Sequence, residues 1–576
     1  MGHPPARQLR AGLVLASVIA AAATAVAGPA AASPKTTDWS AYLDGPSHTS
    51  YNASAVSITP AALADLQPVW QFQAPASPNS GSVGDLASPV VVDGVVYVGL
   101  ADGQMYAVSE ATQSVLWSRS LGFIKPTTCG SSAGIASTAT VAKDPETGQR
   151  VVFVNAPDGY LYALSAATGA TVWRSVVGIP STTENNYYAW GSPTVASGKV
   201  YIGISSRCDN PLVPAGVLAF SQHSGKRLAY WDSLPKGRIG GSVWSSIGVL
   251  PDGNVVATTG NSKGKTQIPY AEAVAELSGR TLKLLSYWMI PAAQQVTDSD
   301  FGGSPTVFTG RPGGVTTTMV GACNKNGMYY AFRADDIAAG PVWETRIGAP
   351  SGAGVAECDA AAIWNGHYLI EGGGSPVTIG KVTYEGSVQE LNPTTGKVIW
   401  RTGLPGYIIG SAAEDGAGVV AAPTYSAPAT EEGVYLLSAS TGKVLKYLST
   451  APASDFAQPV FDRDNLLVGA IGGLPVTAYA VTKPGQSTPV TVSPATLQPG
   501  QTVTLTVTGT GHFTAPARVI VSGTAVRVES VQVTSSTTAV VKVTVAKTVP
   551  AGSALNLTLA EPDLTAFWCT SCLGVG

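Results

Sequence analysis

One sequence pattern recurs along residues 70–447, about eight times in units of roughly 47 to 58 residues. In its clearest copy, residues 88–117, apolar residues alternate through two runs that are separated by an Asp102-Gly103 turn, and a tryptophan ends the unit. Alternation with a period of two predicts antiparallel strands rather than helices. One such small sheet cannot bury both of its faces, so the copies must pack against each other. The repeat therefore predicts an all-β fold.

A turn containing glycine and a closing aromatic residue stand at the same place in successive copies. Glycine accepts the positive φ of tight hairpins, so each copy is interpreted as a twisted four-stranded blade. Radial packing of blades leaves only short sheet edges, which predicts a β-propeller. We expect the closing residues to be core residues that fill the space between blades. They are Trp70, Trp117, Trp173, Trp231, Trp288, Trp343, Trp400 and Tyr447.

The charge of the chain limits the classes of molecule that it is expected to bind. Only 12% of the 576 residues are charged, and the net charge is −3 with no basic stripe. This balance argues against a nucleic-acid partner and against binding to an anionic membrane surface. Small neutral ligands are favoured instead.

The first residues resemble an export signal. Arg7 and Arg10 precede an apolar run over residues 11–27, and alanines occupy positions 30–32. This order predicts a signal peptide over residues 1–32 that is cleaved after Ala32, and a secreted, extracellular mature protein. The apolar run is too short for a membrane span, and no cysteine near the cleavage site could carry a lipid.

Six cysteines in an exported chain predict disulfides, although six cysteines allow fifteen pairings. Cys569 and Cys572 form a Cys-x-x-Cys pair, but Leu573 follows where covalent haem attachment needs histidine. We therefore expect no haem, and a local disulfide rather than a redox or metal centre. The other cysteines are Cys129, Cys208, Cys323 and Cys358.

Near residue 484 the repeat stops, and residues 490–559 form short Val- and Thr-rich runs between turns. This composition predicts a small β-sandwich. The run SPATLQPGQTVTLTVTGTGHF at residues 493–513 resembles bacterial immunoglobulin-like domains of the IPT/TIG type, which implies a spacer or adhesion module. The expected domains are the propeller over 33–483, an immunoglobulin-like domain over 484–562 and a tail with the Cys-x-x-Cys pair over 563–576.

The blades resemble the quinoprotein dehydrogenases that bind pyrroloquinoline quinone (PQQ), especially the polyvinyl-alcohol-dehydrogenase-like branch. The likeness covers about residues 39–480, and its leading edge is WSAYLDGPSHTSYNASAVSITPAALADLQPVW at 39–70. It implies an eight-bladed propeller whose axial funnel holds PQQ with Ca²⁺ beside it.

Two positions match the family's cofactor and calcium sites. Trp244, in GGSVWSS, corresponds to the indole that stacks on the quinone, although it could equally be another core tryptophan. Asn261, in TTGN, corresponds to a calcium ligand, because calcium prefers oxygen ligands; alone it would be an ordinary residue at a strand end.

Two more positions match the family's funnel. Lys325, in CNKNGMYYAF, would face the quinone oxygens and stabilise negative charge there, unless it is a solvated lysine on a hairpin turn. Asp300, in VTDSDFGGSP, corresponds to a cofactor-binding residue at the funnel rim, with a structural role as the alternative.

The sequence also departs from the family. Glu272 replaces the usual catalytic aspartate before the strand AVAEL; it could accept the alcohol proton or form a surface salt bridge. Asp209 could supply the calcium carboxylate, but Arg207 beside it would repel a divalent cation. The family's pair of adjacent cysteines is missing.

Two hypotheses remain. The first is a PQQ- and calcium-dependent alcohol or polyol dehydrogenase that passes electrons to an external acceptor. The second is a catalytically degenerate propeller that binds an extracellular ligand or serves as a scaffold, because a fold alone does not fix a function. A scaffold for membrane-protein assembly is a weaker third idea, because the sequence carries the extended entry segment and no lipid anchor.

Overall fold

The computed structural model describes residues 1–2, 38–72, 74, 87–124, 134–180, 186–188, 190–264, 268–350, 357–425, 431–450, 456–469, 476–485, 489–522, 526–547 and 549–576. The chain divides into two units, Met1–Thr36 and Thr37–Gly576, and the second contains all the elements below. Residues 3–32 of the predicted signal peptide and Cys129 lie outside the described residues. Within those ranges, helices that could cross a bilayer are absent.

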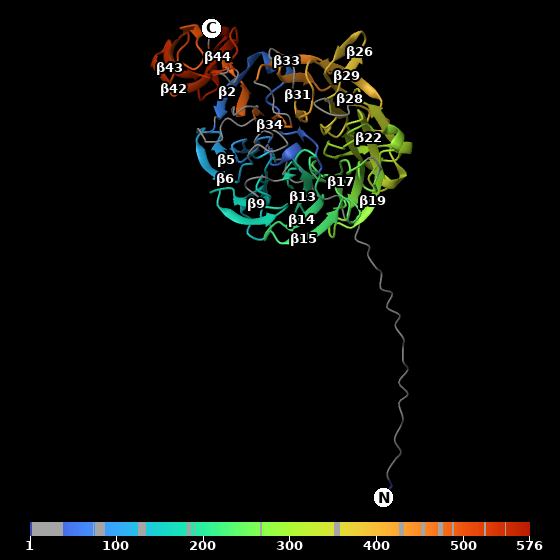
Figure 1. The fold of residues 1–576 in the computed structure, drawn as a ribbon. Helices are drawn as coiled ribbons and strands as arrows, with labels where there is room; N and C mark the ends of the chain where they lie inside the picture. Colours follow the sequence, from blue (N-terminus) through green and yellow to red (C-terminus); the bar gives the residue numbers. More distant parts are fainter. Residues whose placement is uncertain are drawn as a thin grey trace. The chain divides into compact units, whose positions relative to one another are not determined.

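Four-stranded antiparallel sheets follow one another along the second unit and are arranged radially, as a β-propeller (Figure 1). The first sheets are β3 (Val90–Val92), β4 (Val95–Gly99), β5 (Gln104–Ser109) and β6 (Val115–Ser120); β7 (Thr140–Lys143), β8 (Arg150–Asn155), β9 (Tyr160–Ser165) and β10 (Thr171–Val176); β12 (Thr194–Ala196), β13 (Lys199–Ser206), β14 (Gly216–Ser221) and β15 (Arg227–Asp232), with β11 (Tyr187–Tyr188) on β13; and β16 (Gly248–Val249), β17 (Val255–Thr258), β18 (Ala273–Leu277) and β19 (Leu284–Met289).

The sheets continue in the same order, each with its first strand innermost. They are β20 (Thr306–Gly310), β21 (Thr317–Asn324), β22 (Met328–Arg333) and β23 (Trp343–Arg346); β24 (Ile363–Trp364), β25 (Leu369–Gly373), β28 (Gly386–Leu391) and β29 (Val398–Leu404), with the hairpin β26 (Val377–Ile379) and β27 (Val382–Tyr384); and β30 (Ala413–Asp415), β31 (Val419–Thr424), β32 (Gly433–Ser438) and β33 (Val444–Leu448). Short 3₁₀ helices occur at η1 (Tyr42–Asp44), η2 (Pro60–Asp65), η3 (Ala292–Gln294), η4 (Pro312–Gly314) and η5 (Ile337–Ala339).

The last propeller sheet joins the two ends of the repeat. It consists of β34 (Val460–Asp462), β35 (Asn465–Val468) and β36 (Val476–Val481), and β2 (Leu66–Phe72) supplies its outer strand. Trp70 of β2 lies opposite Ala478 of β36. Because an early strand completes a late sheet, main-chain hydrogen bonds close the array of blades.

The closing tryptophans pack between blades, as predicted. Trp70, Trp117, Trp231 and Trp343 are buried, and the remaining closing residues are half-buried. Several indoles donate a hydrogen bond to a main-chain oxygen of the next sheet, at 2.9 Å from Trp117 to Ala166 and 3.1 Å from Trp343 to Pro393. The ring then lies on a turn glycine with positive φ, where a Cβ would come within 2.6 Å of the indole. These glycines are Gly169, Gly225, Gly396 and Gly442.

The entry segment, residues 39–55, runs along the inner strands of most sheets. Its main-chain oxygens accept hydrogen bonds from the first strands of successive sheets, at 2.8 to 3.0 Å. The Gln458 side chain binds the Leu43 amide at 3.1 Å and so ties this segment to the last sheet. The bonded pairs are Trp39 with Val91, Ser40 with Val141, Pro46 with Val249, Ser47 with Val307, Thr49 with Trp364, and Ser50 with Glu414. β1 (Tyr51–Asn52) also pairs with β30.

The C-terminal residues form two sheets that share one apolar core. One sheet contains β38 (Thr491–Ser493), β40 (Thr502–Thr508), β43 (Thr538–Val545) and β42 (Val526–Ser535). The other contains β37 (Lys483–Pro484), β45 (Thr565–Val575), β44 (Ala554–Ala560) and β41 (Arg518–Val521), with β39 (Thr496–Leu497) on β45. Residues 563–576, expected as a separate tail, thus include a strand of the sandwich, because Phe567 and Leu573 alternate into its core.

The five cysteines in the described ranges form disulfides, as the sequence predicts, although the sequence does not fix their pairing. Cys569 and Cys572 form a local disulfide, as expected for the Cys-x-x-Cys pair. Cys323 is joined to Cys358, and Cys208 is also disulfide-bonded. The Cys323–Cys358 bond holds the loop of Glu357 and Asp359 against the end of β21, beside Lys325.

Candidate functional site

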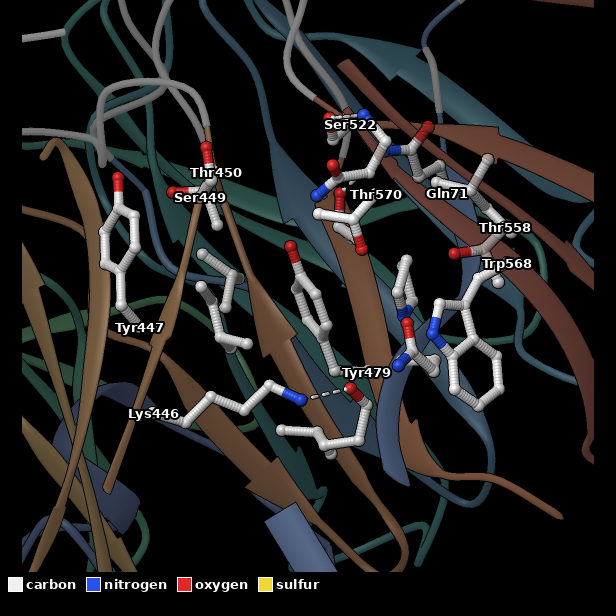
Figure 2. Close-up of a pocket in the computed structure, with 18 of the residues that line it drawn as sticks. Gln71, Lys446, Tyr447, Ser449, Thr450, Tyr479, Ser522, Thr558, Trp568 and Thr570 are labelled. Atoms are coloured by element: carbon white, nitrogen blue, oxygen red, sulfur yellow. Dashed lines mark hydrogen bonds between the residues drawn. The ribbon is translucent and has the colours of Figure 1, made fainter. Parts of the chain in front are cut away.

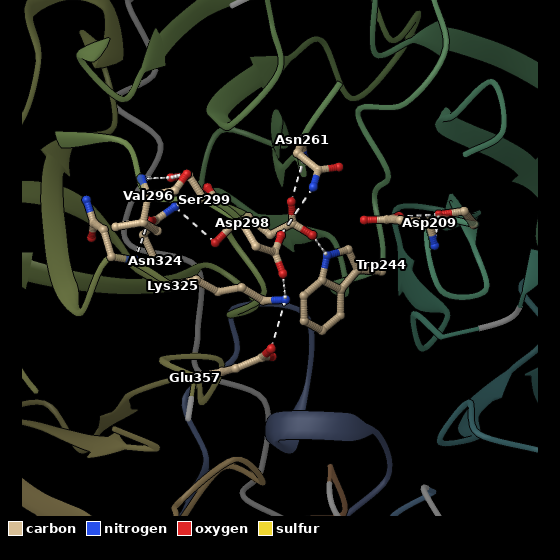
Figure 3. A network of polar contacts seen from close by, with 12 residues as sticks. Asp209, Trp244, Asn261, Val296, Asp298, Ser299, Asn324, Lys325 and Glu357 are labelled. Carbon is tan, nitrogen blue, oxygen red and sulfur yellow. Dashed lines mark hydrogen bonds and ion pairs between the residues drawn. The ribbon is translucent and has the colours of Figure 1, made fainter. Parts of the chain in front are cut away.

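A cavity of about 380 Å³ is lined by most of the predicted site residues, several of which are labelled in Figure 3. This volume lies within the range of about 300–1,000 Å³ that is usual for small-molecule sites. Trp244, Lys325, Asp300 and Asp209 line it, and Asn261 hydrogen-bonds to two of the lining carboxylates. The other lining residues are Trp190, Ser206, Arg207, Cys208, Ser242, Asp298, Glu357 and Phe456.

Trp244 lies in the loop between β15 and β16, outside the blade-closing positions. Its indole nitrogen donates a hydrogen bond of 3.1 Å to Asp300. Gly302 makes room for the ring, because a Cβ at that position would lie 2.3 Å from the indole and 2.0 Å from an Asp359 oxygen. Phe456 stands edge-on to the indole with 6.0 Å between ring centres. An aromatic face is therefore fixed in orientation at the cavity wall.

Three carboxylates converge beside this indole. Asp209, Asp298 and Asp300 offer oxygens that lie within 4.8 Å of one another. Asn261 fixes two of these side chains: its amide nitrogen donates to Asp300 at 2.5 Å, and its side-chain nitrogen donates to Asp298 at 3.2 Å. Oxygen ligands at this spacing suit a hard cation such as Ca²⁺.

Lys325, at the end of β21, faces the same cluster. Its Nζ lies 2.9 Å from Asp298, 3.1 Å from Glu357 and 5.2 Å from the centre of the Trp244 ring. Burial would lower the pKa of Lys325, but the surrounding carboxylates, Asp359 first, raise this pKa above its ordinary value. The lysine is therefore cationic, and it is buried rather than solvated on its hairpin.

Negative charge is in excess around this lysine. Burial raises the pKa of Asp300 to about 7, and the nearby Asp298 and Asp209 carboxylates add to the rise. Burial also raises the pKa of Asp209. Such shifts mark carboxylates that lack enough compensating charge, and a bound cation would supply it.

Asp359 forms a second layer beneath the indole. It lines a small cavity of about 40 Å³ together with Trp244 and Tyr42. Neither of its buried oxygens has a hydrogen-bond partner among the described residues. Burial, followed by the adjacent Glu357 carboxylate, raises the pKa of Asp359 well above its usual range.

Glu272 lies away from this cluster. Its half-buried carboxylate hydrogen-bonds to the Gln295 side chain, and Glu272 is not among the residues that line the cavity. Burial raises its pKa, and Asp298 contributes a smaller rise through its charge. Its role as the base stays a prediction from the sequence.

Arg207 reaches the cavity as well. Its guanidinium lies 5.6 Å from the centre of the Tyr188 ring, and its main-chain oxygen accepts a bond from the Trp190 indole at 3.1 Å. The same cavity wall therefore offers a second cation, which suits an anionic ligand.

Asp298 and Glu357 are site residues that the sequence reasoning did not single out. The Asp-x-Asp spacing before Phe301 carries a signal for Asp298, because two carboxylates that alternate along a loop before a strand can converge on one cation. Glu357 has no local signal; the Cys323–Cys358 disulfide brings it beside Lys325.

Comparison with known sequences finds a family model and relatives that match parts of this chain. Residues 39–254 match the PQQ family model, described as "Glucose/ethanol/alcohol dehydrogenase, beta-propeller domain". The alcohol dehydrogenase (quinone), dehydrogenase subunit, of Gluconacetobacter polyoxogenes is 36% identical over 124 residues, which are 21% of this chain and 16% of that protein. The quinohemoprotein alcohol dehydrogenase of Comamonas testosteroni is 30% identical over 187 residues, 31% of this chain and 23% of that protein. The chain thus spans less than a quarter of these relatives in sequence.

Solved structures share the fold over a longer stretch. The quinohemoprotein alcohol dehydrogenase from Comamonas testosteroni has a TM-score of 0.61 and 19% identity, and covers 78% of this chain and 81% of its own. A europium-containing methanol dehydrogenase has a TM-score of 0.58 and 16% identity, and covers 76% of this chain and 90% of its own. Residues 39–254 are thus similar in sequence to PQQ-type quinoprotein alcohol dehydrogenases, and the solved structures share the β-propeller fold.

Proposed function

We propose that the protein is a PQQ-dependent dehydrogenase of small alcohols or polyols, with a hard cation at the three-aspartate cluster. The observation that carries this proposal is the convergence of Trp244, Lys325 and the aspartate cluster on one cavity of about 380 Å³. An aromatic face, a fixed lysine and clustered oxygen ligands are what a flat, polyanionic, metal-associated quinone requires.

The residues present fit such a group. PQQ carries carboxylates and carbonyl oxygens, and the cavity contains the cations Lys325 and Arg207 together with a surplus of carboxylates that favours a metal ion. Asp209, Asp300 and Asn261 would hold the metal, calcium or a trivalent ion of similar size, with Asp298 beside them. Trp244 would support the quinone plane.

When bound, the quinone would supply the acceptor for the hydride of the alcohol carbon, which carries both electrons of the oxidation. Lys325, buried and cationic, stabilises the negative charge that develops on the acceptor side. The alcohol proton needs a base in the cavity. Asp298 is placed for this role because it lines the cavity, whereas Glu272 is the candidate from the sequence.

The wider architecture forms part of the proposal. We place the sheets in an eight-bladed ring followed by an immunoglobulin-like domain, since β2 completes the last sheet and residues 489–576 form a two-sheet core. We place the protein outside the cytoplasm, since each of the five cysteines in the described ranges is disulfide-bonded. Electrons would leave to an external acceptor, as the name of the 1-butanol dehydrogenase (cytochrome c) of Thauera butanivorans states for that relative.

Reconstitution tests the function. Purified protein is incubated with PQQ and either Ca²⁺ or Eu³⁺, and quinone absorbance and dye-linked oxidation of ethanol and glycerol are followed. Saturable PQQ binding with turnover supports the proposal. Binding without turnover supports the degenerate-site alternative, and no binding removes the quinone from the function.

Two variants identify the base. Asp298→Asn should abolish turnover, while Glu272→Gln should keep it and leave PQQ binding unchanged. If Glu272→Gln alone abolishes turnover, the assignment of Asp298 is wrong and the base predicted from the sequence is correct.

A further inference from the structure

A separate cavity of about 200 Å³ lies between strands β2, β33 and β36 of the propeller and strands β41, β44 and β45 of the C-terminal sandwich (Figure 2). None of its lining residues lines the axial cavity. It is bounded by regular strands on both sides, so its walls are fixed by main-chain pairing.

The sandwich presents a polar face to this cavity. Along β44, Leu555, Leu557 and Leu559 point into the sandwich core, while Asn556 and Thr558 alternate to the other side. Trp568 of β45 lies opposite Thr558 in the register. These polar residues therefore offer hydrogen-bonding groups to a polar molecule in the cavity.

Two hydroxyl groups lack partners in this cavity. Tyr479 and Thr558 are 7% and 3% exposed, and neither hydroxyl bonds to any residue in the described ranges. The Tyr479 hydroxyl points into the space between the propeller and sandwich strands (Figure 2). Both oxygens are open to the cavity, so each can exchange a hydrogen bond to water for one to a ligand, which is worth about 0.5–1.5 kcal/mol.

The charge of the lining selects the ligand. Its described residues include no aspartate, glutamate, arginine or histidine, and Lys446 is the one cation. The Lys446 amino group already donates to the main-chain oxygens of Leu63 and Leu66, at 2.6 and 2.8 Å. What remains is a set of aromatic rings, side-chain amides and hydroxyls.

We infer that this cavity binds a neutral polyhydroxylated ligand the size of one sugar ring. A cavity of about 200 Å³ has room for one such ring. The C–H face of a sugar packs on an aromatic ring such as Tyr479 or Trp568, and its hydroxyls exchange hydrogen bonds with Thr558, Asn556 and Gln71. The site is independent of the dehydrogenase proposal.

The test uses the full chain and simple probes. D-glucose, D-galactose and myo-inositol are titrated in a calorimeter, and tryptophan fluorescence is followed in parallel. We expect at least one probe to bind saturably, with about 3- to 10-fold weaker affinity in each of Tyr479→Phe and Thr558→Val, since each loses one hydrogen bond. Matched controls at exposed positions, Tyr287→Phe and Thr504→Val, should bind as the wild type does.

Three outcomes would overturn the inference. These are no saturable binding of any of the three probes, unchanged affinity in both cavity variants, and tighter binding of D-gluconate than of D-glucose, which would show a preference for anions. The two cavity variants differ from the wild type by one or two atoms each, and a circular-dichroism melt establishes that they fold.

Discussion

At the rim of the propeller four closing tryptophans pack on a turn glycine of the next sheet, whereas at the axis charged side chains from several sheets meet. The rim contact of Trp343 with Gly396 recurs from sheet to sheet with an indole hydrogen bond. The axial contacts of Lys325 with Asp298 and Glu357 occur once. Repeated apolar contacts stabilise the ring, and this stability allows the centre to hold buried carboxylates that a small domain could not.

The largest expected effect is at the axis. Lys325→Met should lower the turnover of the PQQ- and metal-loaded enzyme by about 10²–10³-fold, because it removes a fixed cation beside developing negative charge. It should also tighten metal binding, since the Asp298 carboxylate then loses its competing partner. Steady-state kinetics and metal titration measure both. Lys325→Arg, which keeps the charge, should retain more activity; equal loss in both variants would contradict an electrostatic role.

The rim should respond in stability instead. Gly396→Ala places a Cβ 2.4 Å from the Trp343 ring at a φ of +70°, so we expect a loss of about 2–4 kcal/mol in unfolding free energy. Gly418→Ala is the matched control, because its φ is +83° and nothing lies within 4 Å of the new Cβ. Urea unfolding measures both. A Gly396 variant no less stable than the Gly418 variant would show that the rim contact is loose.

Buried acids should make stability depend on pH. Burial raises the pKa of Asp462, on inner strand β34, to about 8. Because this value exceeds the unfolded value of about 3.9, the stabilising effect is complete below pH 4 and is lost as pH rises to about 8, by at most about 1.4 kcal/mol per pH unit. Asp462→Asn should flatten that fall. Thermal melts of both proteins from about pH 5 to about pH 9 measure it; parallel curves would show that another group titrates.

The smallest effect should come from one indole hydrogen bond at the rim. Trp400→Phe keeps most of the apolar contact but leaves the Ala439 oxygen without its 3.1 Å bond. We expect a loss of about 0.5–1.5 kcal/mol in urea unfolding and no change in turnover. A change in turnover would show that rim and axis are coupled.

The sequence predicts the rim better than the axis because only the rim repeats. The period-two runs and the closing residues identify the blades, and both the Trp343 contact and the Cys569–Cys572 disulfide agree with expectation. The family likeness pointed to Trp244, Asn261, Asp300 and Lys325, which lie at or beside one cavity, and their roles stay predictions.

The sequence does not predict contacts between segments that are far apart along the chain, because no local pattern marks these contacts. Glu357 reaches Lys325 through a disulfide, and the carboxylate of Glu272 is directed to Gln295 by a backbone with a φ of 51°. Asp209 lies far from Asp298 in sequence, and their oxygens meet only because neighbouring sheets converge at the axis. The division at residue 562 failed to anticipate β45 because a Cys-x-x-Cys tail has no strand alternation that is easy to recognise.

The position of the entry segment has a consequence for how the chain folds. Leu43 bonds to Gln458, 415 residues later, and β2 pairs with β36, the last strand of the propeller. During synthesis, Leu43 and β2 are therefore made long before their partners Gln458 and β36. Closure of the propeller is then late and slow, because it depends on contacts between remote parts of the chain. Until then the edge of β2 is unpaired, and there a chaperone would be of most use.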